Sequence, residues 1–131
     1  MQFTKAHGTG NDFVVFADLD DQLEISPAIV QAVTDRRFGI GADGVIRIGR
    51  SQAADVFMDY RNADGSIVEM CGNGIRVVAK YVLDRKLVSG ETTVAVETRA
   101  GVKRVNATLA ADGTVDEVTV DMGSAVFDPG E

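Results

Sequence analysis

The sequence GIRVVAKYVLDRK at residues 74–86 carries the clearest secondary-structure signal of the chain. Its apolar side chains recur at intervals of three and four residues, and charged side chains stand on the opposite face; the apolar ones are Ile75, Val78, Ala79, Val82 and Leu83. This spacing places them on one broad face of an α-helix. The sequence therefore predicts a helix over 74–86 whose wide apolar face must be covered by other elements.

Short strands are predicted on both sides of this helix. Before it, β-branched and aromatic residues are frequent in residues 2–8, 12–18, 45–48, 56–60 and 67–70. After it, apolar and polar residues alternate, with the apolar ones at Val94, Val96, Val105, Ala107, Leu109, Val118, Val120 and Met122. The turn sequence NADG before the last of the earlier runs predicts a hairpin, and the later alternation predicts a β-meander.

A second helix is predicted to begin near residue 27. Ser26 is a favourable N-cap, and Pro27 suits the first helical position. Further apolar residues continue the helical pattern, namely Ile29, Val30, Val33 and Phe38. The sequence thus predicts a helix that runs up to Gly39.

Length and composition limit the class of protein. The chain has 131 residues, which suits one compact unit, and its apolar content of 45% is too high for a mainly disordered chain. Its 13 basic and 20 acidic residues give a net charge of −7 and are spread evenly, so no basic stripe is available for nucleic acid. No apolar run approaches the roughly 18 residues that span a membrane, and the N-terminus lacks the apolar block of a signal peptide. We therefore expect a cytoplasmic protein with no nucleic-acid and no membrane partner.

A single cysteine, Cys71, stands directly before the central predicted helix. With one cysteine and one histidine, His7, the chain lacks the residues for an internal disulfide, and we expect no metal. Gly72 and Asn73 follow the cysteine, and the backbone N–H groups of such a helix start favour negative charge. They would lower the pKa of the thiol from its ordinary value of about 8.5, or hold a substrate carboxylate. On these residues alone, a small buried apolar side chain is the slightly favoured alternative.

Three turns carry residues that could line a pocket. The segment 39–44, GIGADG, matches the letters of a dinucleotide-binding motif, but it follows a predicted helix and precedes a predicted strand, the reverse of the order that the motif requires. We interpret it as a turn that allows close backbone approach. Asn11 and Asn62 stand in two other turns, where asparagine is common. Their amides can also accept from an ammonium group and donate to a carboxylate, as an amino-acid site requires.

Four motifs together resemble the N-terminal half of the diaminopimelate epimerase family. In chain order they are HGTGNDF at 7–13, RFGIGADG at 37–44, RNADGS at 61–66 and MCGNGIR at 70–76. The match covers nearly the whole chain, and Asn73 distinguishes it from proline racemase, which typically has histidine at this place. The resemblance implies an α+β, diaminopimelate epimerase-like domain with a curved, mostly antiparallel sheet around a central helix.

The resemblance also implies an activity. Members of the family are isomerases that interconvert LL- and meso-diaminopimelate in lysine and peptidoglycan synthesis without a cofactor, using two cysteines on opposite sides of the α-carbon. Carried over by position, Cys71 would be the first acid/base cysteine, and Gly72 and Asn73 would bind the α-carboxylate. Asn11 and Asn62 would contact the substrate. No pyridoxal lysine motif is evident, so oriented donors and a dry pocket would have to stabilise the carbanion.

Two departures from the family pattern shape these expectations. Gly44 stands where some members have a substrate-contacting glutamine. The second cysteine belongs to a half that this sequence lacks, and we expect residues 1–125 to form the N-terminal domain and 126–131 to begin a linker. In the family the last segment of the chain also returns to complete the first domain. We therefore expect exposed apolar surface, and either a second epimerase domain or a homodimer as partner.

Two other functions remain open at this stage. One is an isomerase of the same fold that acts on a different amino or hydroxy acid, and Asn73 favours the epimerase over it. The other is a non-catalytic module that binds an amino acid or a partner chain through the half-site. Such a module would bind its ligand without exchanging the α-proton, and would form a homodimer that covers the face of Cys71.

Overall fold

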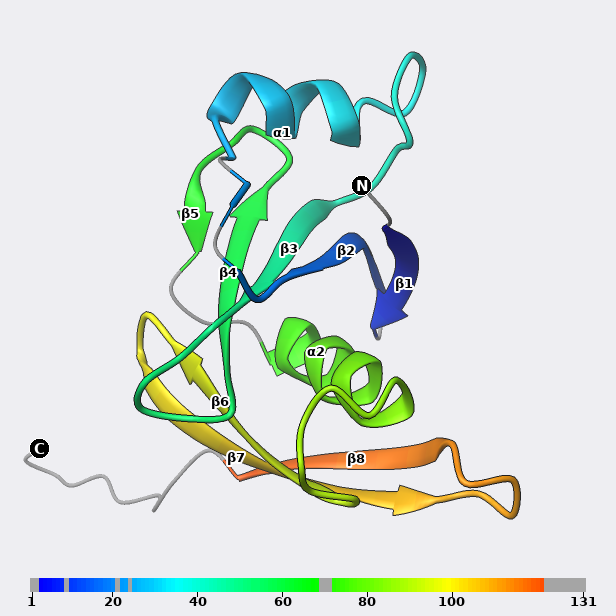
Figure 1. Ribbon diagram of the computed structural model, residues 1–131. Coiled ribbons are helices and arrows are strands. Elements are labelled where there is room, and N and C mark those ends of the chain that lie inside the picture. Colours follow the sequence, from blue (N-terminus) through cyan, green and yellow to red (C-terminus); the bar gives the residue numbers. More distant parts are fainter. Residues whose placement is uncertain (1–2, 9, 21, 24, 69–71, 122–131) are drawn as a thin grey trace, which may run out of the picture.

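One curled sheet wraps around the helix α2 (Gly72–Asp84) in the computed structural model of the chain (Figure 1). The structure describes residues 3–8, 10–20, 22–23, 25–68 and 72–121. The strands are β1 (Thr4–Gly8), β2 (Asn11–Asp18), β3 (Gly44–Gly49), β4 (Val56–Asn62), β5 (Ile67–Val68), β6 (Thr93–Thr98), β7 (Gly101–Leu109) and β8 (Val115–Asp121). A second helix, α1 (Pro27–Thr34), lies outside the curl.

The strand order is β1-β2-β3-β4-β6-β7-β8, and β5 pairs with β4 alone. Only the pairs β2–β3 and β4–β6 are parallel among the described strands; the others are antiparallel. The hairpin of β4 with β5 and the meander β6–β8 are confirmed. The expectation of an α+β fold with a curved, mostly antiparallel sheet around a central helix is therefore confirmed as well.

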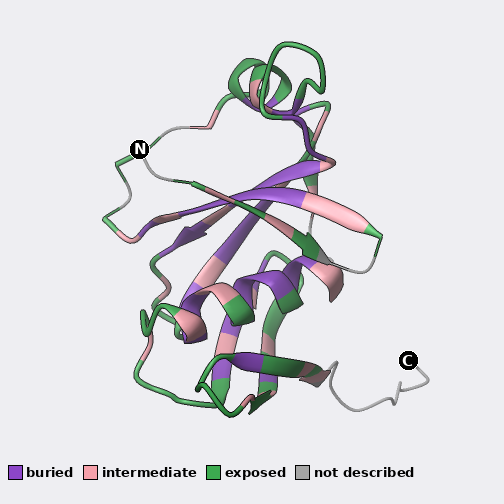
Figure 2. Ribbon diagram, turned by 90° about the vertical axis from the view of Figure 1, so that its right-hand side faces the viewer, coloured by how far each residue is buried: buried purple, intermediate pink, exposed green. Residues whose placement is uncertain are grey.

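The main core lies between α2 and the concave face of the sheet. Ile75, Val78 and Val82 of α2 are fully buried. They pack in one cluster with apolar side chains of six strands, among them Phe13, Ile46, Met58, Val96, Val105 and Val115. Figure 2 shows these buried residues gathered on α2 and on the strands that face it. This burial meets the requirement that the wide apolar face of the helix be covered on several sides.

A smaller cluster fills the space under α1, on the convex face of the sheet. It joins Val30 of the helix to Val14, Phe16 and Val45 of β2 and β3. Ser26 caps the helix by accepting a hydrogen bond from the backbone N–H of Ile29 at 3.1 Å. The predicted start of this helix is therefore confirmed.

The predicted end of α1 is wrong, because the helix stops at Thr34 and not near Gly39. Asp35 is extended, and its carboxylate accepts hydrogen bonds from the backbone N–H groups of Arg37 at 2.7 Å and Phe38 at 3.0 Å. An aspartate that bonds to nearby backbone in this way competes with the helix. Phe38, which appeared to continue the apolar stripe, is 86% exposed.

The central helix begins and ends two residues earlier than its predicted bounds. It closes in a Schellman motif: Lys86 has a φ of 55°, its N–H donates to Leu83, and the N–H of Leu87 donates to Val82. Within the described residues no helix is both long and apolar enough to cross a membrane. Met70 and the expected domain limit at residue 125 lie outside the described residues.

Exposed apolar side chains are present in the described part of the chain, as expected. The large ones are Phe3, Leu23, Ile29, Phe38, Ile40, Ile67, Leu87, Val102 and Leu109. Four of them, Phe3, Leu23, Ile29 and Ile40, line one apolar cavity of about 290 Å³ beside α1. The other five do not line this cavity, and single exposed apolar residues are common on soluble proteins.

Candidate functional site

The sheet brings two of the expected substrate-binding residues, Asn11 and Asn62, to one edge together with Gly44. Asn11 is the first residue of β2, Gly44 is the first of β3, and Asn62 is the last of β4. In the register, Gly44 lies opposite Phe13 on one side and opposite Asn62 on the other. Strands β2 and β3 are parallel, and β4 is antiparallel to β3. The first residues of β2 and β3 therefore lie beside the last residue of β4.

The start of α2 reaches the same edge of the sheet. The side-chain amide of Asn73 donates from Nδ2 to Oδ1 of Asn11 at 2.9 Å, across 62 residues of sequence. Gly72 is the first residue of the helix, and its backbone N–H belongs to the first turn, where N–H groups lack partners within the helix. The structure therefore brings together Asn11, Gly72 and Asn73, three of the residues expected to bind substrate.

Cys71 lies outside the described residues, directly before Gly72 in the sequence. Its role as acid/base and the lowering of its thiol pKa by the helix start stay predictions. The described residues next to Cys71 in the sequence are Gly72 and Asn73, the first two residues of α2.

Asn62 lies at the same edge, but its amide is engaged in its own turn. Its Nδ2 donates to Oγ of Ser66 at 3.3 Å, and its backbone N–H donates to the Ser66 carbonyl at 2.9 Å. The side chain is exposed. Its expected contact with substrate therefore stays a prediction, and a ligand that took this amide would have to compete with Ser66.

Gly44 offers no side-chain contact, because the fold has no space for one. A Cβ placed on it would lie 2.5 Å from Cε1 of Tyr60 and 2.6 Å from the carbonyl oxygen of Arg61. Tyr60 is itself buried and packs edge-on against Phe13 with 5.3 Å between ring centroids. The ring thus occupies the space into which a longer side chain at position 44 would have to extend.

Three charged residues beside Asn11 were not singled out from the sequence as site residues. A cavity of about 420 Å³ is lined by His7, Gly10, Asn11, Asp12, Arg36 and Asp43. Arg36 donates to both carboxylate oxygens of Asp12, at 2.9 and 3.2 Å, and to Asp43 at 3.1 Å. The turn GIGADG had been expected to line a pocket, and its Asp43 does so. The missed signal is that this turn carries a carboxylate between its last two glycines.

The charge of Asp12 is well compensated. Hydrogen bonds from Arg36 hold its pKa well below the ordinary value, and the backbone N–H of Asp43 and the ammonium of Lys5 act in the same direction against the opposing effect of burial. Asp12 is therefore an anion over the whole physiological range. Its carboxylate oxygens accept hydrogen bonds or ion pairs from three separate segments, so Asp12 fixes the position of the first residues of β2.

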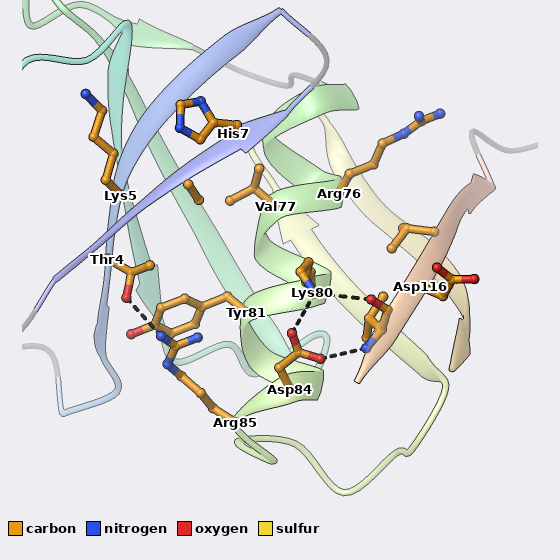
Figure 3. A pocket seen from close by; sticks show the side chains of 13 residues that line it. Thr4, Lys5, His7, Arg76, Val77, Lys80, Tyr81, Asp84, Arg85 and Asp116 are labelled. Atoms are coloured by element: carbon orange, nitrogen blue, oxygen red, sulfur yellow. Dashed lines mark hydrogen bonds and ion pairs between the residues drawn. The ribbon is translucent and has the colours of Figure 1, made fainter. Parts of the chain in front are cut away.

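A larger groove runs between β1, α2 and β8, the two outer strands of the sheet and the helix (Figure 3). Its volume is about 530 Å³. Lys80 and Asp84 of α2 point toward β8, where Asp84 accepts from the N–H of Val115 at 2.8 Å and Lys80 donates to its carbonyl at 3.1 Å. On the other side, Arg85 donates to Thr4 of β1. The helix therefore ties together two strands that are not hydrogen-bonded to each other within the described sheet.

The described part of the chain contains no group of three metal-ligating His, Cys, Asp or Glu side chains. The donor set at the sheet edge instead consists of amides, backbone N–H groups of a helix start, and an arginine–aspartate network. Such donors suit an anionic or zwitterionic small molecule.

Several solved structures share this fold. The chain superposes on methylitaconate-delta-isomerase with a TM-score of 0.69 at 17% identity, covering 86% of this chain and 35% of that one. It superposes on a probable proline racemase from Agrobacterium radiobacter with a TM-score of 0.66 at 18% identity, covering 90% and 40%. A phenazine biosynthesis protein of the PhzF family from Bacillus anthracis gives a TM-score of 0.62 at 20% identity, covering 90% and 37%. At such identities these likenesses define the fold alone.

Sequence comparison identifies the family. The family model for diaminopimelate epimerase matches residues 3–127. The chain is 47% identical to the diaminopimelate epimerase of Thermobifida fusca, covering 99% of this chain and 51% of the relative. It is 48% identical to that of Agathobacter rectalis, covering 100% and 45%. The chain belongs to the diaminopimelate epimerase family, and it spans about half the length of the curated relatives that it matches.

Proposed function

We propose that this chain forms the N-terminal half of an enzyme that interconverts LL- and meso-diaminopimelate in the cytoplasm. The observation that carries the proposal is the hydrogen bond between Asn73 and Asn11. It joins the helix start that follows Cys71 to the edge of the sheet where Asn62 also lies. Side-chain amides and the N–H groups of a helix start, gathered at one place, are the donors that an α-amino acid needs.

In this proposal Cys71 exchanges a proton with the α-carbon. As a thiolate it accepts the α-proton and becomes a thiol, and the electron pair of the broken C–H bond stays on the α-carbon. A thiol from the second half then donates its proton to the opposite face and becomes a thiolate. The N–H groups of Gly72 and Asn73 would hold the α-carboxylate and stabilise the negative charge that develops next to it. The proposal includes no cofactor and no metal.

Residues 1–125 form the N-terminal domain in this proposal, and a second epimerase domain completes the site. We propose that a segment of this second half enters the groove between β1 and β8 (Figure 3), since these two strands are the outer strands of the described sheet. An outer strand of a sheet can pair with an added strand along its open side. Amide hydrogen exchange in β1 and β8 should slow when the second half is added; unchanged exchange there would rule out this position.

The first test is α-proton exchange. The chain, alone and joined to its second half, is incubated in heavy water with LL- or meso-diaminopimelate, and deuterium at the α-carbon is read by mass spectrometry. We expect the two-half enzyme to incorporate deuterium and interconvert the isomers. Cys71→Ala should abolish both, and Cys71→Ser should lower both by more than about 100-fold because a hydroxyl is a far weaker acid than a thiol.

The alternatives predict other outcomes. Activity that survives both substitutions would contradict the role of Cys71. Exchange with a different amino or hydroxy acid in a substrate panel, and none with diaminopimelate, would indicate another isomerase of the same fold. Binding without exchange, together with a homodimer in light scattering, would indicate a non-catalytic module.

A further inference from the structure

We propose that Asp43 is a positioning residue that sets the orientation of the Asn11 amide and, through it, of the Asn73 amide at the start of α2. This inference rests on the proposed function, because it assigns a task to a residue beside that site. Asp43 is not expected to touch the substrate. It comes from the turn GIGADG, for which the sequence indicated only a pocket-lining role.

The side chains of Asn73, Asn11 and Asp43 form a chain of hydrogen bonds in which each asparagine amide donates to the next residue. Nδ2 of Asn73 donates to Oδ1 of Asn11 at 2.9 Å, and Nδ2 of Asn11 donates to Oδ2 of Asp43 at 3.4 Å. The same Oδ2 accepts from the backbone N–H of Asp12 at 3.1 Å. The three side chains come from three different places in the fold: Asn73 from the start of α2, Asn11 from the start of β2, and Asp43 from the turn before β3.

The direction of this chain follows from the chemistry of the carboxylate. An ionised aspartate only accepts hydrogen bonds, whereas an asparagine amide can turn over and exchange its donor and acceptor ends. Beside Asp43, Asn11 must therefore present its NH₂ group to the carboxylate, which leaves its carbonyl oxygen facing Asn73. Asn73 must in turn present its NH₂ group to Asn11. A single acceptor at position 43 thus selects one orientation for both amides.

Asp43 is held firmly enough to perform this task. Arg36 donates from one terminal nitrogen to Oδ1 of Asp43 at 3.1 Å and to Oδ1 of Asp12 at 2.9 Å, so it locks the two carboxylates together. The backbone N–H of Asp43 donates to the Asp12 carboxylate at 2.9 Å. Gly41 has a φ of +84°, and a Cβ placed on it would lie 3.2 Å from Cα of Arg36, so a residue without a side chain suits this turn before β3.

The experiment uses Asp43→Asn, which keeps the shape of the side chain but supplies a donor. The new amide can donate to Asn11, so position 43 no longer selects one orientation of the Asn11 amide or, through it, of the Asn73 amide. In the two-half enzyme we expect KM for diaminopimelate to rise about tenfold or more while kcat changes by less than about threefold, since binding contacts are lost and the base is untouched. Asp43→Glu keeps an acceptor and should recover part of the lost affinity. Asp20→Asn, a substitution of the same charge at a 77% exposed side chain, is the control.

A second readout does not depend on activity. In the 131-residue chain, Asp43→Asn should move the side-chain amide signals of both Asn11 and Asn73 in a ¹⁵N correlation spectrum, and Asp20→Asn should leave them in place. Unmoved signals would overturn the inference whether or not the enzyme acts on diaminopimelate. A lower kcat and melting temperature with an unchanged KM would also overturn it, because that pattern indicates a merely structural residue.

A double-mutant comparison completes the test. If Asp43 acts through Asn11, adding Asp43→Asn to Asn11→Ala should raise KM no further than Asn11→Ala alone. Additive effects would show that Asp43 acts by another route. An enzyme without diaminopimelate epimerase activity would contradict the proposed function, and the spectra alone would then decide on the orientation of the amides.

Discussion

At the scale of single residues, Asp59 shows how the described chain stabilises a buried charge. Its carboxylate is 4% exposed and accepts hydrogen bonds from Arg61 and Arg99, both at 2.9 Å; the Nε of Arg47 lies 3.6 Å away. Burial acts to raise the pKa of Asp59, but the bonds from Arg61 and Arg99 outweigh it and leave the pKa below its ordinary value. The folded state therefore favours the anion.

We predict that Asp59→Asn lowers the free energy of unfolding by about 2–4 kcal/mol at pH 7, because it removes the buried carboxylate that pairs with the half-buried guanidinium groups of Arg61 and Arg99. A lowered pKa gives stability that is present above the ordinary pKa of aspartate, about 4, and is lost as the pH falls through the lower folded value. The difference between the two proteins should therefore shrink below about pH 4. Urea unfolding between pH 3 and 8 measures it.

The control for this prediction is Asp116→Asn, an exposed position in β8, which should change the free energy of unfolding by less than about 0.5 kcal/mol. A difference for Asp59→Asn that is the same at pH 3 and pH 7 would contradict the proposed role of the charge. That outcome would mean that shape rather than ionisation determines the contribution of the residue.

At the scale of elements, the contact between β3 and β4 depends on the absence of a side chain at Gly44. The residue is buried between its partners Phe13 and Asn62, and the nearest atoms include the Arg61 carbonyl of the backbone ladder. A backbone atom cannot turn aside as a flexible side chain can. The start of β3 is therefore tightly packed at the edge that holds the candidate site.

We predict that Gly44→Ala costs about 1–3 kcal/mol of stability, as expected for an overpacked core position. It should also weaken ligand binding, because the strand start must shift together with Asn11 and Asn62. Thermal unfolding and isothermal titration with diaminopimelate measure the two effects. Gly113→Ala is the comparison: its φ is +89° and no atom lies within 4 Å of an added Cβ, so only strain of about 1–2 kcal/mol is expected, without loss of binding. Equal effects of the two substitutions on binding would contradict this account.

At the scale of the whole molecule, α2 is the element on which the curled sheet closes. It contacts strands on every side, from β1 and β2 to β7 and β8 (Figure 1). Its first turn contributes Asn73 to the candidate site, and its last turn binds β8 through Asp84. Stability and site geometry are therefore coupled through one helix.

We predict that Ile75→Ala, at a fully buried position one turn from the site, lowers the free energy of unfolding by about 2–5 kcal/mol. The matched control is Ile67→Ala in β5, where the same side chain is 54% exposed and the cost should be below about 1 kcal/mol. Calorimetry on both variants measures the difference. Equal destabilisation by the two substitutions would show that α2 is not the centre of the core.

The sequence by itself determined the family and those structural features that depend on only a few neighbouring residues. The period of apolar residues predicted α2 and the strands, Ser26 and Pro27 predicted the start of α1, and four ordered motifs indicated diaminopimelate epimerase. These predictions succeed because capping, amphipathic periodicity and turn chemistry depend on near neighbours. The predicted end of α1 is wrong because the carboxylate of Asp35 accepts hydrogen bonds from the backbone of the next residues. These bonds end the helix although the apolar pattern continues beyond it.

Only the tertiary structure decided which distant residues meet. The parallel pairs β2–β3 and β4–β6, the bond between Asn73 and Asn11, and the network of Asp12, Arg36 and Asp43 join segments far apart in the chain. Which strands become neighbours depends on how all apolar faces are buried at once around α2, and that free energy belongs to the whole chain rather than to any segment. For this reason the sequence could supply the types of residue in the site, whereas the fold determined their partners, distances and orientation.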